Sequence, residues 1–224
     1  MVRARSRQAR NLIGTKADGT SDLGNSLDGV RIESLSNIVG ATGAGNVIVG
    51  NGNNGVLLIG DDARSNVIRS NNITANDQHG VLARKGPNDV LGNIIVGNFE
   101  AGVLVLSSAS QVKIMGNQIF ANGEVGIDLA GGLQFSSGVT VNDTDDPDTG
   151  SNGLQNFPVL TSAVKSNQTN ITTVAGSLNS NGSTDFTIEL FRVLADPSGY
   201  GEGLELIGSK QIRTSSGGDR NLPS

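Results

Sequence analysis

The feature that most constrains the fold of this chain is an internal repeat between residues 11 and 130. A glycine followed by alternating aliphatic residues recurs every 22 to 26 residues, at Gly29, Gly55, Gly80, Gly102 and Gly126. The segments between these elements are short and consist mainly of Asn, Gly, Asp and Ser. A unit of this length built from short strands cannot bury its own apolar side chains, so neighbouring units must stack on one another.

A second aliphatic element alternates with the first and usually ends in asparagine. It reads NVIVGN at 46–51, NVIRSN at 66–71, NIIVGN at 93–98 and VKIMGN at 112–117. β-Branched residues bounded by turn formers are typical of strands, and the frequent Gly and Asn disfavour helices. We therefore predict a parallel β-solenoid with a rise of about 4.8 Å per unit. It should contain one aliphatic column of Ile48, Ile68, Ile95 and Ile114 and one set of corner asparagines at Asn51, Asn71, Asn98 and Asn117.

Counting from each repeat glycine predicts which side chains face the core. The first and third residues after the glycine are expected to point inward, and the second outward. The outward position carries Leu57, Leu82 and Leu104 in three successive units. Such an apolar stripe needs a cover. Two interpretations stay open, namely cover by another part of this chain and a binding surface for a partner.

Composition narrows the classes of function. The formal net charge is −5, and the chain has no Cys and no Trp. A nucleic-acid partner is therefore not expected, and disulfide scaffolds, thiolate zinc sites and thiol nucleophiles are excluded. No apolar run approaches the roughly 20 residues of a membrane span. The basic residues 1–10 are not followed by the apolar stretch of a signal peptide.

The sequences NLIGTKADGTSDLGNSLDGVRIE at 11–33 and NIVGATGAGNVIVGNGNNGVLL at 37–58 resemble the repeat arrays of bacterial right-handed parallel β-helix proteins. These proteins share the pectin-lyase-like superfold, and the resemblance covers most of residues 11–130. It implies a fragment of a larger secreted or surface protein, and hence an extracellular or cell-surface location for that parent. The superfold hosts lyases, hydrolases, adhesins and spacers, so the resemblance is specific for fold and not for activity.

The period stops at Gly131, and the predicted organisation changes there. We expect a basic tail at 1–10, the parallel β-helix at 11–140, an acidic hinge at 141–157, a partial β-sandwich at 158–216 and a tail at 217–224. The sandwich is expected to be immunoglobulin-like but incomplete, because four strand-like runs are present where about seven are usual. The segment at 195–209 also resembles sequence that follows β-helices in the same bacterial proteins.

Four carboxylates gather within six residues of the hinge, at Asp143, Asp145, Asp146 and Asp148. Oxygen ligands at alternating positions beside a glycine turn suit calcium. The spacing is not that of an EF-hand, because no Glu stands at the required distance. A calcium site and a solvated acidic linker both stay open, and no other cofactor is expected.

The catalytic candidates are polar residues that follow the second repeat glycine or flank the third, namely Asp61, Asp62, His79 and Lys85. The Asp pair and the His-Gly dipeptide loosely resemble those of polygalacturonases, in which paired carboxylates act as acid and base. The resemblance is incomplete, because Gln78 precedes the histidine and no Asn-x-Asp stands upstream. A simpler interpretation places the Asp pair beside Arg84 and Lys85 on stacked units, as exposed ion pairs of small energetic effect.

These observations favour a non-enzymatic structural or adhesive module of a secreted or cell-surface bacterial protein. Its expected partner is a cell-surface glycan or protein, or another copy that associates through exposed solenoid ends. The alternative is a calcium-dependent polysaccharide lyase or glycoside hydrolase of the pectin-lyase-like superfold.

Overall fold

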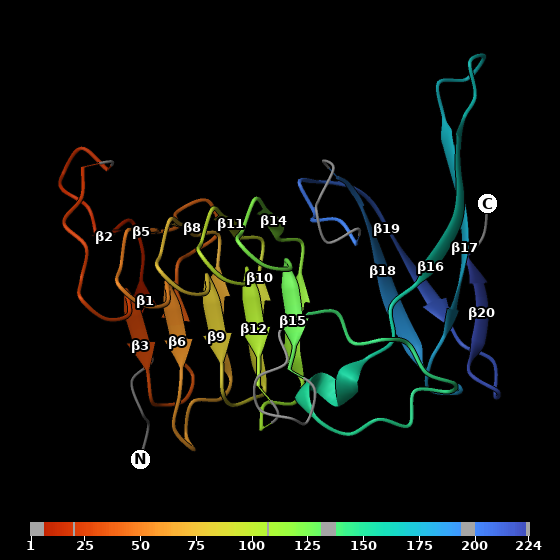
Figure 1. The fold of residues 1–224 in the computed structure, drawn as a ribbon, viewed down its shortest axis with the longest axis horizontal. Coiled ribbons are helices and arrows are strands. Elements are labelled where there is room, and N and C mark those ends of the chain that lie inside the picture. Colours follow the sequence, from red (N-terminus) through yellow and green to blue (C-terminus); the bar gives the residue numbers. More distant parts are fainter. Residues whose placement is uncertain (1–6, 20, 107, 131–137, 194–199, 223–224) are drawn as a thin grey trace.

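The computed structural model describes residues 7–19, 21–106, 108–130, 138–193 and 200–222. Its first part is a parallel β-solenoid, in which three sheets run side by side along the long axis (Figure 1). Each coil contributes one strand to each sheet. The predicted fold class, an all-β chain with a parallel β-helix followed by a partial β-sandwich, is confirmed.

The strands of the solenoid are two to four residues long and fall into three sheets. The first sheet holds β1 (Arg7–Gln8), β4 (Ile38–Val39), β7 (Asn66–Arg69), β10 (Asn88–Leu91) and β13 (Val112–Met115). The second holds β2 (Leu12–Ile13), β5 (Val47–Val49), β8 (Asn72–Thr74), β11 (Ile94–Val96) and β14 (Gln118–Phe120). The third holds β3 (Val30–Ile32), β6 (Val56–Leu58), β9 (Val81–Ala83), β12 (Val103–Val105) and β15 (Ile127–Leu129).

The core consists of apolar columns that take one residue from each coil. The repeat glycine precedes the strands of the third sheet, and the residues one and three places after it face the core, as predicted. The predicted single column of isoleucines is in fact two columns. Ile48 and Ile95 lie in the second sheet, whereas Ile68 and Ile114 lie in the first. The similar elements of the sequence alternate between two sheets, because each coil contains three strands and not two.

Asparagines, most of them buried, link the coils in three ladders. The first ladder contains Asn11, Asn46, Asn71, Asn93 and Asn117. The second contains Asn25, Asn51, Asn76, Asn98 and Asn122. The third contains Asn37, Asn66 and Asn88. The predicted single set of corner asparagines was therefore wrong in the same way as the isoleucine column, since its members divide between the first two ladders.

Each rung of a ladder repeats one hydrogen-bond arrangement. The backbone N and the Nδ2 of Asn71 both donate to Oδ1 of Asn93 at 3.0 Å, while Oδ1 of Asn71 accepts from Asn46. Nδ2 of Asn71 also donates to the carbonyl oxygen of Val39. Asparagine suits this role because its amide carries two donors and an oxygen that accepts twice. The interior amide of Asn71 thereby finds all of its hydrogen-bond partners within the protein.

The repeat glycines are required by close approach between coils. A Cβ on Gly80 would lie 2.7 Å from the carbonyl oxygen of Gly102 and still closer to Cγ2 of Ile95. It would also lie 3.0 Å from Nδ2 of Asn98 in the second ladder. The glycine therefore leaves the space in which the isoleucine column and the asparagine ladder meet.

After the solenoid, the chain forms a short 3-10 helix, η1 (Ser151–Leu154), and two antiparallel sheets (Figure 1). One contains β16 (Val159–Lys165), β17 (Thr172–Asn179) and β20 (Asp219–Leu222), and the other contains β18 (Asp185–Arg192) and β19 (Glu205–Arg213). All of β16 is exposed, as expected of an incomplete sandwich. Both predicted tails need correction, because β1 and β20 fall inside them and pair with β4 and β17.

Among the described residues, the structure has no helix long and apolar enough to cross a membrane.

Substituting a repeat glycine should strongly destabilise the solenoid. We expect Gly80→Ala to lower the free energy of unfolding by about 2 kcal/mol or more, because the added methyl group overpacks a rigid joint. Gly208→Ala is the matched control, since nothing lies within 4 Å of a Cβ at that position. Urea unfolding followed by circular dichroism measures both, and equal effects would contradict the explanation.

Removing one rung should also be costly. Asn71→Ala deprives buried donors on Asn46 of their acceptor and empties the space of one amide. We expect a loss of about 3 kcal/mol or more, because each unsatisfied buried donor costs roughly 1 to 3 kcal/mol. The exposed Asn221→Ala is the control, and its unfolding midpoint should stay close to that of the unmodified chain.

Candidate functional site

The acidic and basic catalytic candidates form exposed ion pairs. Nζ of Lys85 lies 3.1 Å from Oδ1 of Asp61, one coil away, as the simpler interpretation predicted. Asp62 instead pairs with Arg64 of its own turn, at 3.2 Å. Since both aspartates are more than half exposed, these pairs contribute little to stability.

His79 does not join this group. It precedes β9, whereas Lys85 follows it, so the two side chains lie beyond opposite ends of the strand. Paired catalytic groups must be held within reach of one substrate bond. The four catalytic candidates therefore do not converge on a single site.

Both ring nitrogens of His79 are engaged. Its Nδ1 accepts a hydrogen bond from the backbone N of Ala101 at 3.2 Å, and its Nε2 lies 2.9 Å from Oε2 of Glu100. Because Nδ1 accepts a hydrogen bond, the proton of the neutral ring is on Nε2. The N–H group at Nε2 then donates a hydrogen bond to the carboxylate. Only 11% of the histidine side chain is exposed, so neither nitrogen is available to take a proton from a substrate.

Burial lowers the pKa of His79 from 6.5 to about 4. The loss of hydration on burial is the cause of this lowered pKa, although a carboxylate lies nearby. The histidine is therefore neutral at physiological pH, and the contact with Glu100 is a hydrogen bond from a neutral ring. A group with this pKa is a poor general base near pH 7.

Two more acidic side chains follow Glu100 toward the end of the solenoid, Glu124 on the next coil and Asp128 in β15. Burial raises the pKa of Glu100, and the charge of Glu124 on the next coil raises it further. Burial also raises the pKa of Asp128, with a smaller effect from Glu124, while a hydrogen bond from the backbone N of Gly138 lowers it. One carboxylate oxygen of Asp128 is buried, and no partner for it lies among the described residues. In the described part of the chain, no three of these groups could share a metal ion.

The leucine stripe is largely covered within the chain. Leu57 and Leu82 are each 6% exposed, and Leu104 is half-buried. Its next position holds Asp128, which pairs in register with Leu104. Residues 138–140 return to β15, where Thr140 Oγ1 donates to the carbonyl oxygen of Leu129. This arrangement supports the interpretation of intramolecular cover, and a partner surface at the stripe stays a prediction.

The carboxylates of the four hinge aspartates do not gather around one position that a metal ion could occupy. Asp146 is buried and accepts hydrogen bonds from Ser180 Oγ and from the backbone N of Asn156. Oδ1 of Asp145 accepts from Nδ2 of Asn179 at 3.2 Å. Asp143 is bound to the amide of Asn156 through its backbone, and Asp148 lies in the irregular segment before η1. Asp145 and Asp146 therefore join the hinge to the end of β17 and the residue after it, whereas Asp143 is bonded within the hinge. Calcium binding stays a prediction.

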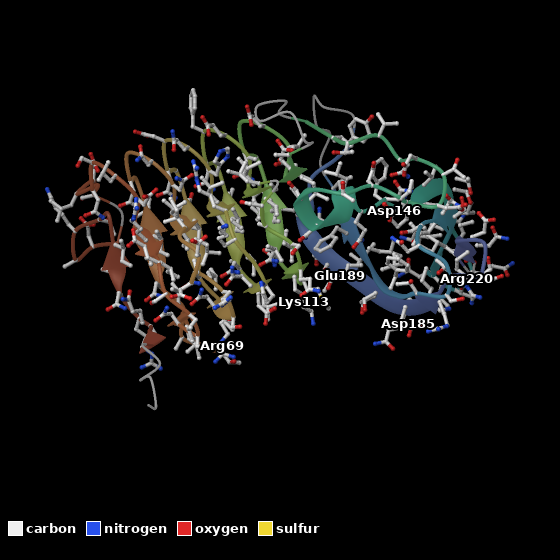
Figure 2. The ribbon with its side chains drawn as sticks, turned by 90° about the horizontal axis from the view of Figure 1, so that it is seen from below. Arg69, Lys113, Asp146, Asp185, Glu189 and Arg220 are labelled. Carbon is white, nitrogen blue, oxygen red and sulfur yellow. The ribbon has the colours of Figure 1, made fainter. Side chains whose placement is uncertain are left out.

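The solenoid ends in an open hollow of about 640 Å³ between the last coil and the C-terminal strands. Ile119 and Ile127 line it on one side, and Phe157 and Tyr200 on the other, with their rings edge to face at 6.0 Å. Glu189 and Glu202 complete the wall, and Figure 2 shows Glu189 at the junction of the two parts. Sequence reasoning missed both glutamates, because no repeat or local motif marks residues that meet the solenoid only through folding.

The comparisons with known proteins concern the solenoid. The family model described as "Right handed beta helix region" matches residues 8–154, which is more than half of the chain. No curated protein matches the sequence. The matched range begins at β1 and ends with η1, so it includes the helix that follows the last coil.

The lowered pKa of His79 predicts a pH-dependent stability. The unfolded chain takes up a proton near pH 6.5 but the folded chain only near pH 4, so the fold loses stability as pH falls through this window. At pH 5 the loss from this residue is about 2 kcal/mol relative to neutral pH. His79→Gln, which can still donate to Glu100, should remove that part of the pH dependence. Urea unfolding of both proteins at pH 7.5 and pH 5 measures the difference, and parallel pH profiles would contradict the assignment.

Proposed function

Because the chain belongs to the right-handed β-helix family, we propose that it serves as a structural or adhesive repeat module and not as an enzyme. The observation that carries this proposal is that the catalytic candidates are already engaged in ion pairs and hydrogen bonds with other residues of the chain. The aspartates and Lys85 lie in exposed ion pairs, and both nitrogens of His79 are occupied. A regular repeat on which, among the described residues, the four catalytic candidates do not converge suits a spacer or a binding surface.

The proposal includes an extracellular or cell-surface location and a glycan or protein partner. Both rest on the resemblance to bacterial β-helix arrays. The asparagine ladders support a spacer role, because their amides are hydrogen-bonded from coil to coil along the solenoid.

A second candidate function, hydrolysis or lysis of a polysaccharide, is favoured by one observation. The hollow at the end of the solenoid combines two carboxylates, Glu189 and Glu202, with the aromatic rings of Phe157 and Tyr200. Paired carboxylates are the acid–base groups of glycosidases. Against this reading, both carboxylates already accept hydrogen bonds from the solenoid, Glu189 from the backbone N of Gly116 and Glu202 from Nδ2 of Asn122.

A glycan screen distinguishes the two functions. The purified chain is incubated with pectate, alginate and chitin, with calcium and then with a chelator, and reducing ends and unsaturated uronides are followed. We expect no cleavage by a chain that circular dichroism shows to be folded, and retention on one of the same glycans when immobilised if the module is adhesive. Cleavage that disappears in Glu189→Gln or Glu202→Gln would establish the enzymatic alternative and overturn the proposal.

A further inference from the structure

The asparagine ladders give the solenoid a direction. In every joint, the backbone N and Nδ2 of one asparagine donate to Oδ1 of the asparagine one coil later. The first coil therefore presents acceptors at its outer side, among them Oδ1 of Asn11 and Asn25. In the described part of the chain, no earlier rung donates to either oxygen. The last coil presents donors that would require a further coil.

Three segments from beyond the solenoid each supply an acceptor to a donor of the last coil. Oδ1 of Asn152 in η1 accepts from the backbone N of Val112 at 2.8 Å, as Asn88 does from Asn66 in the third ladder. Oε1 of Glu202 accepts from Nδ2 of Asn122 at 3.3 Å. The Glu189 carboxylate accepts from the backbone N of Gly116 at 2.9 Å. We call these three residues, with Gly203, the terminal cap.

The terminal cap also continues one sheet. The backbone N of Ile119 in β14 donates to the carbonyl oxygen of Gly203 at 2.8 Å. This bond lies where the next strand of the second sheet would accept. The cap therefore replaces a sixth coil by single acceptors placed along the edge of the fifth, and such edges otherwise invite pairing with another chain.

The terminal cap supplies hydrogen-bond acceptors that a further coil would provide, but it covers the apolar side chains of the last coil less completely than a further coil would. Ile127 on the last coil is 44% exposed, whereas Val103, its register partner one coil earlier, is fully buried. The hollow of about 640 Å³ lies over this end of the core. A stacked coil would cover the same apolar surface at the density of the solenoid interior.

We propose that the terminal cap is an autoinhibitory contact that covers a docking surface for the first coil of a second copy. This inference rests on the proposed function as a structural module. The acceptors of Asn11 and Asn25 match the donors of the last coil in chemical type and in spacing, since both belong to the same ladders. The association is head to tail and does not close on itself, so an uncapped chain forms linear filaments.

Opening the terminal cap tests the proposal. In the full chain, the triple substitution Asn152→Ala, Glu189→Ala and Glu202→Ala removes the three side-chain acceptors. We expect concentration-dependent oligomers in sedimentation velocity, whereas the unmodified chain stays monomeric. The matched control is Glu189→Gln with Glu202→Gln, which keeps an acceptor oxygen at both positions and should stay monomeric. A folded triple variant that remains monomeric overturns the proposal.

The orientation of the association is tested by disulfide trapping, since the chain has no native cysteine. Leu27, Asn53, Gln78, Glu100 and Glu124 form one column, joined by backbone hydrogen bonds. Head-to-tail stacking would place residue 27 of one copy about 4.8 Å from residue 124 of the next, within disulfide reach. In the opened background, Leu27→Cys mixed with Glu124→Cys should give the mixed dimer under mild oxidation. Predominance of either like-with-like dimer overturns the proposal.

Two further controls separate specific stacking from aggregation. Asn25→Lys in the opened background replaces an acceptor by a cation and should restore the monomer, which aggregation of unfolded chains would not do. If circular dichroism shows the triple variant to be unfolded, the same cysteine trapping in Glu202→Ala decides the outcome. Glycan cleavage by the monomer would overturn the proposed function without affecting these results, and failure to stack would leave the glycan results unaffected.

Discussion

The buried amide joint between coils is the interaction on which the rest of the structure depends. An asparagine can occupy it only if its oxygen receives two donors and its own donors find acceptors one coil away. This requirement fixes the register of all three sheets, because a slip of one residue would leave a row of buried amides unpaired. The apolar columns then align without a further specification, and the repeat glycines clear the space in which isoleucine and asparagine meet.

The same requirement explains the C-terminal end of the solenoid. A polar ladder cannot simply stop inside a protein, so the last coil needs acceptors from elsewhere in the chain, and Asn152, Glu189 and Glu202 supply them. The C-terminal strands are poorly buried by themselves, with all of β16 exposed. Part of their role in this fold is thus to bring two glutamates to the edge of the solenoid.

The sequence predicted the solenoid and the inward positions of the third sheet because glycine spacing and aliphatic alternation are local signals. It failed to separate the first two sheets, since NVIVGN and NVIRSN look alike although one belongs to β5 and the other to β7. The pair Asp61–Lys85 was predictable from stacked positions. The partner of His79, Glu100, and the contacts of Glu189 were not, because they depend on which side chains meet across coils and across the hollow.

The long connection between β2 and β3 shows where such a molecule tolerates change. It spans 14–29 and includes an isolated bridge between Thr15 and Asp22, whereas β5 and β6 are joined by only 50–55. Extra residues at a corner leave every column intact, while an extra residue within a strand would reverse its two faces. The length of the solenoid along its axis can therefore change only in whole steps of about 4.8 Å, one step for each coil added or removed. The number of repeats in the sequence sets the distance that the molecule can span.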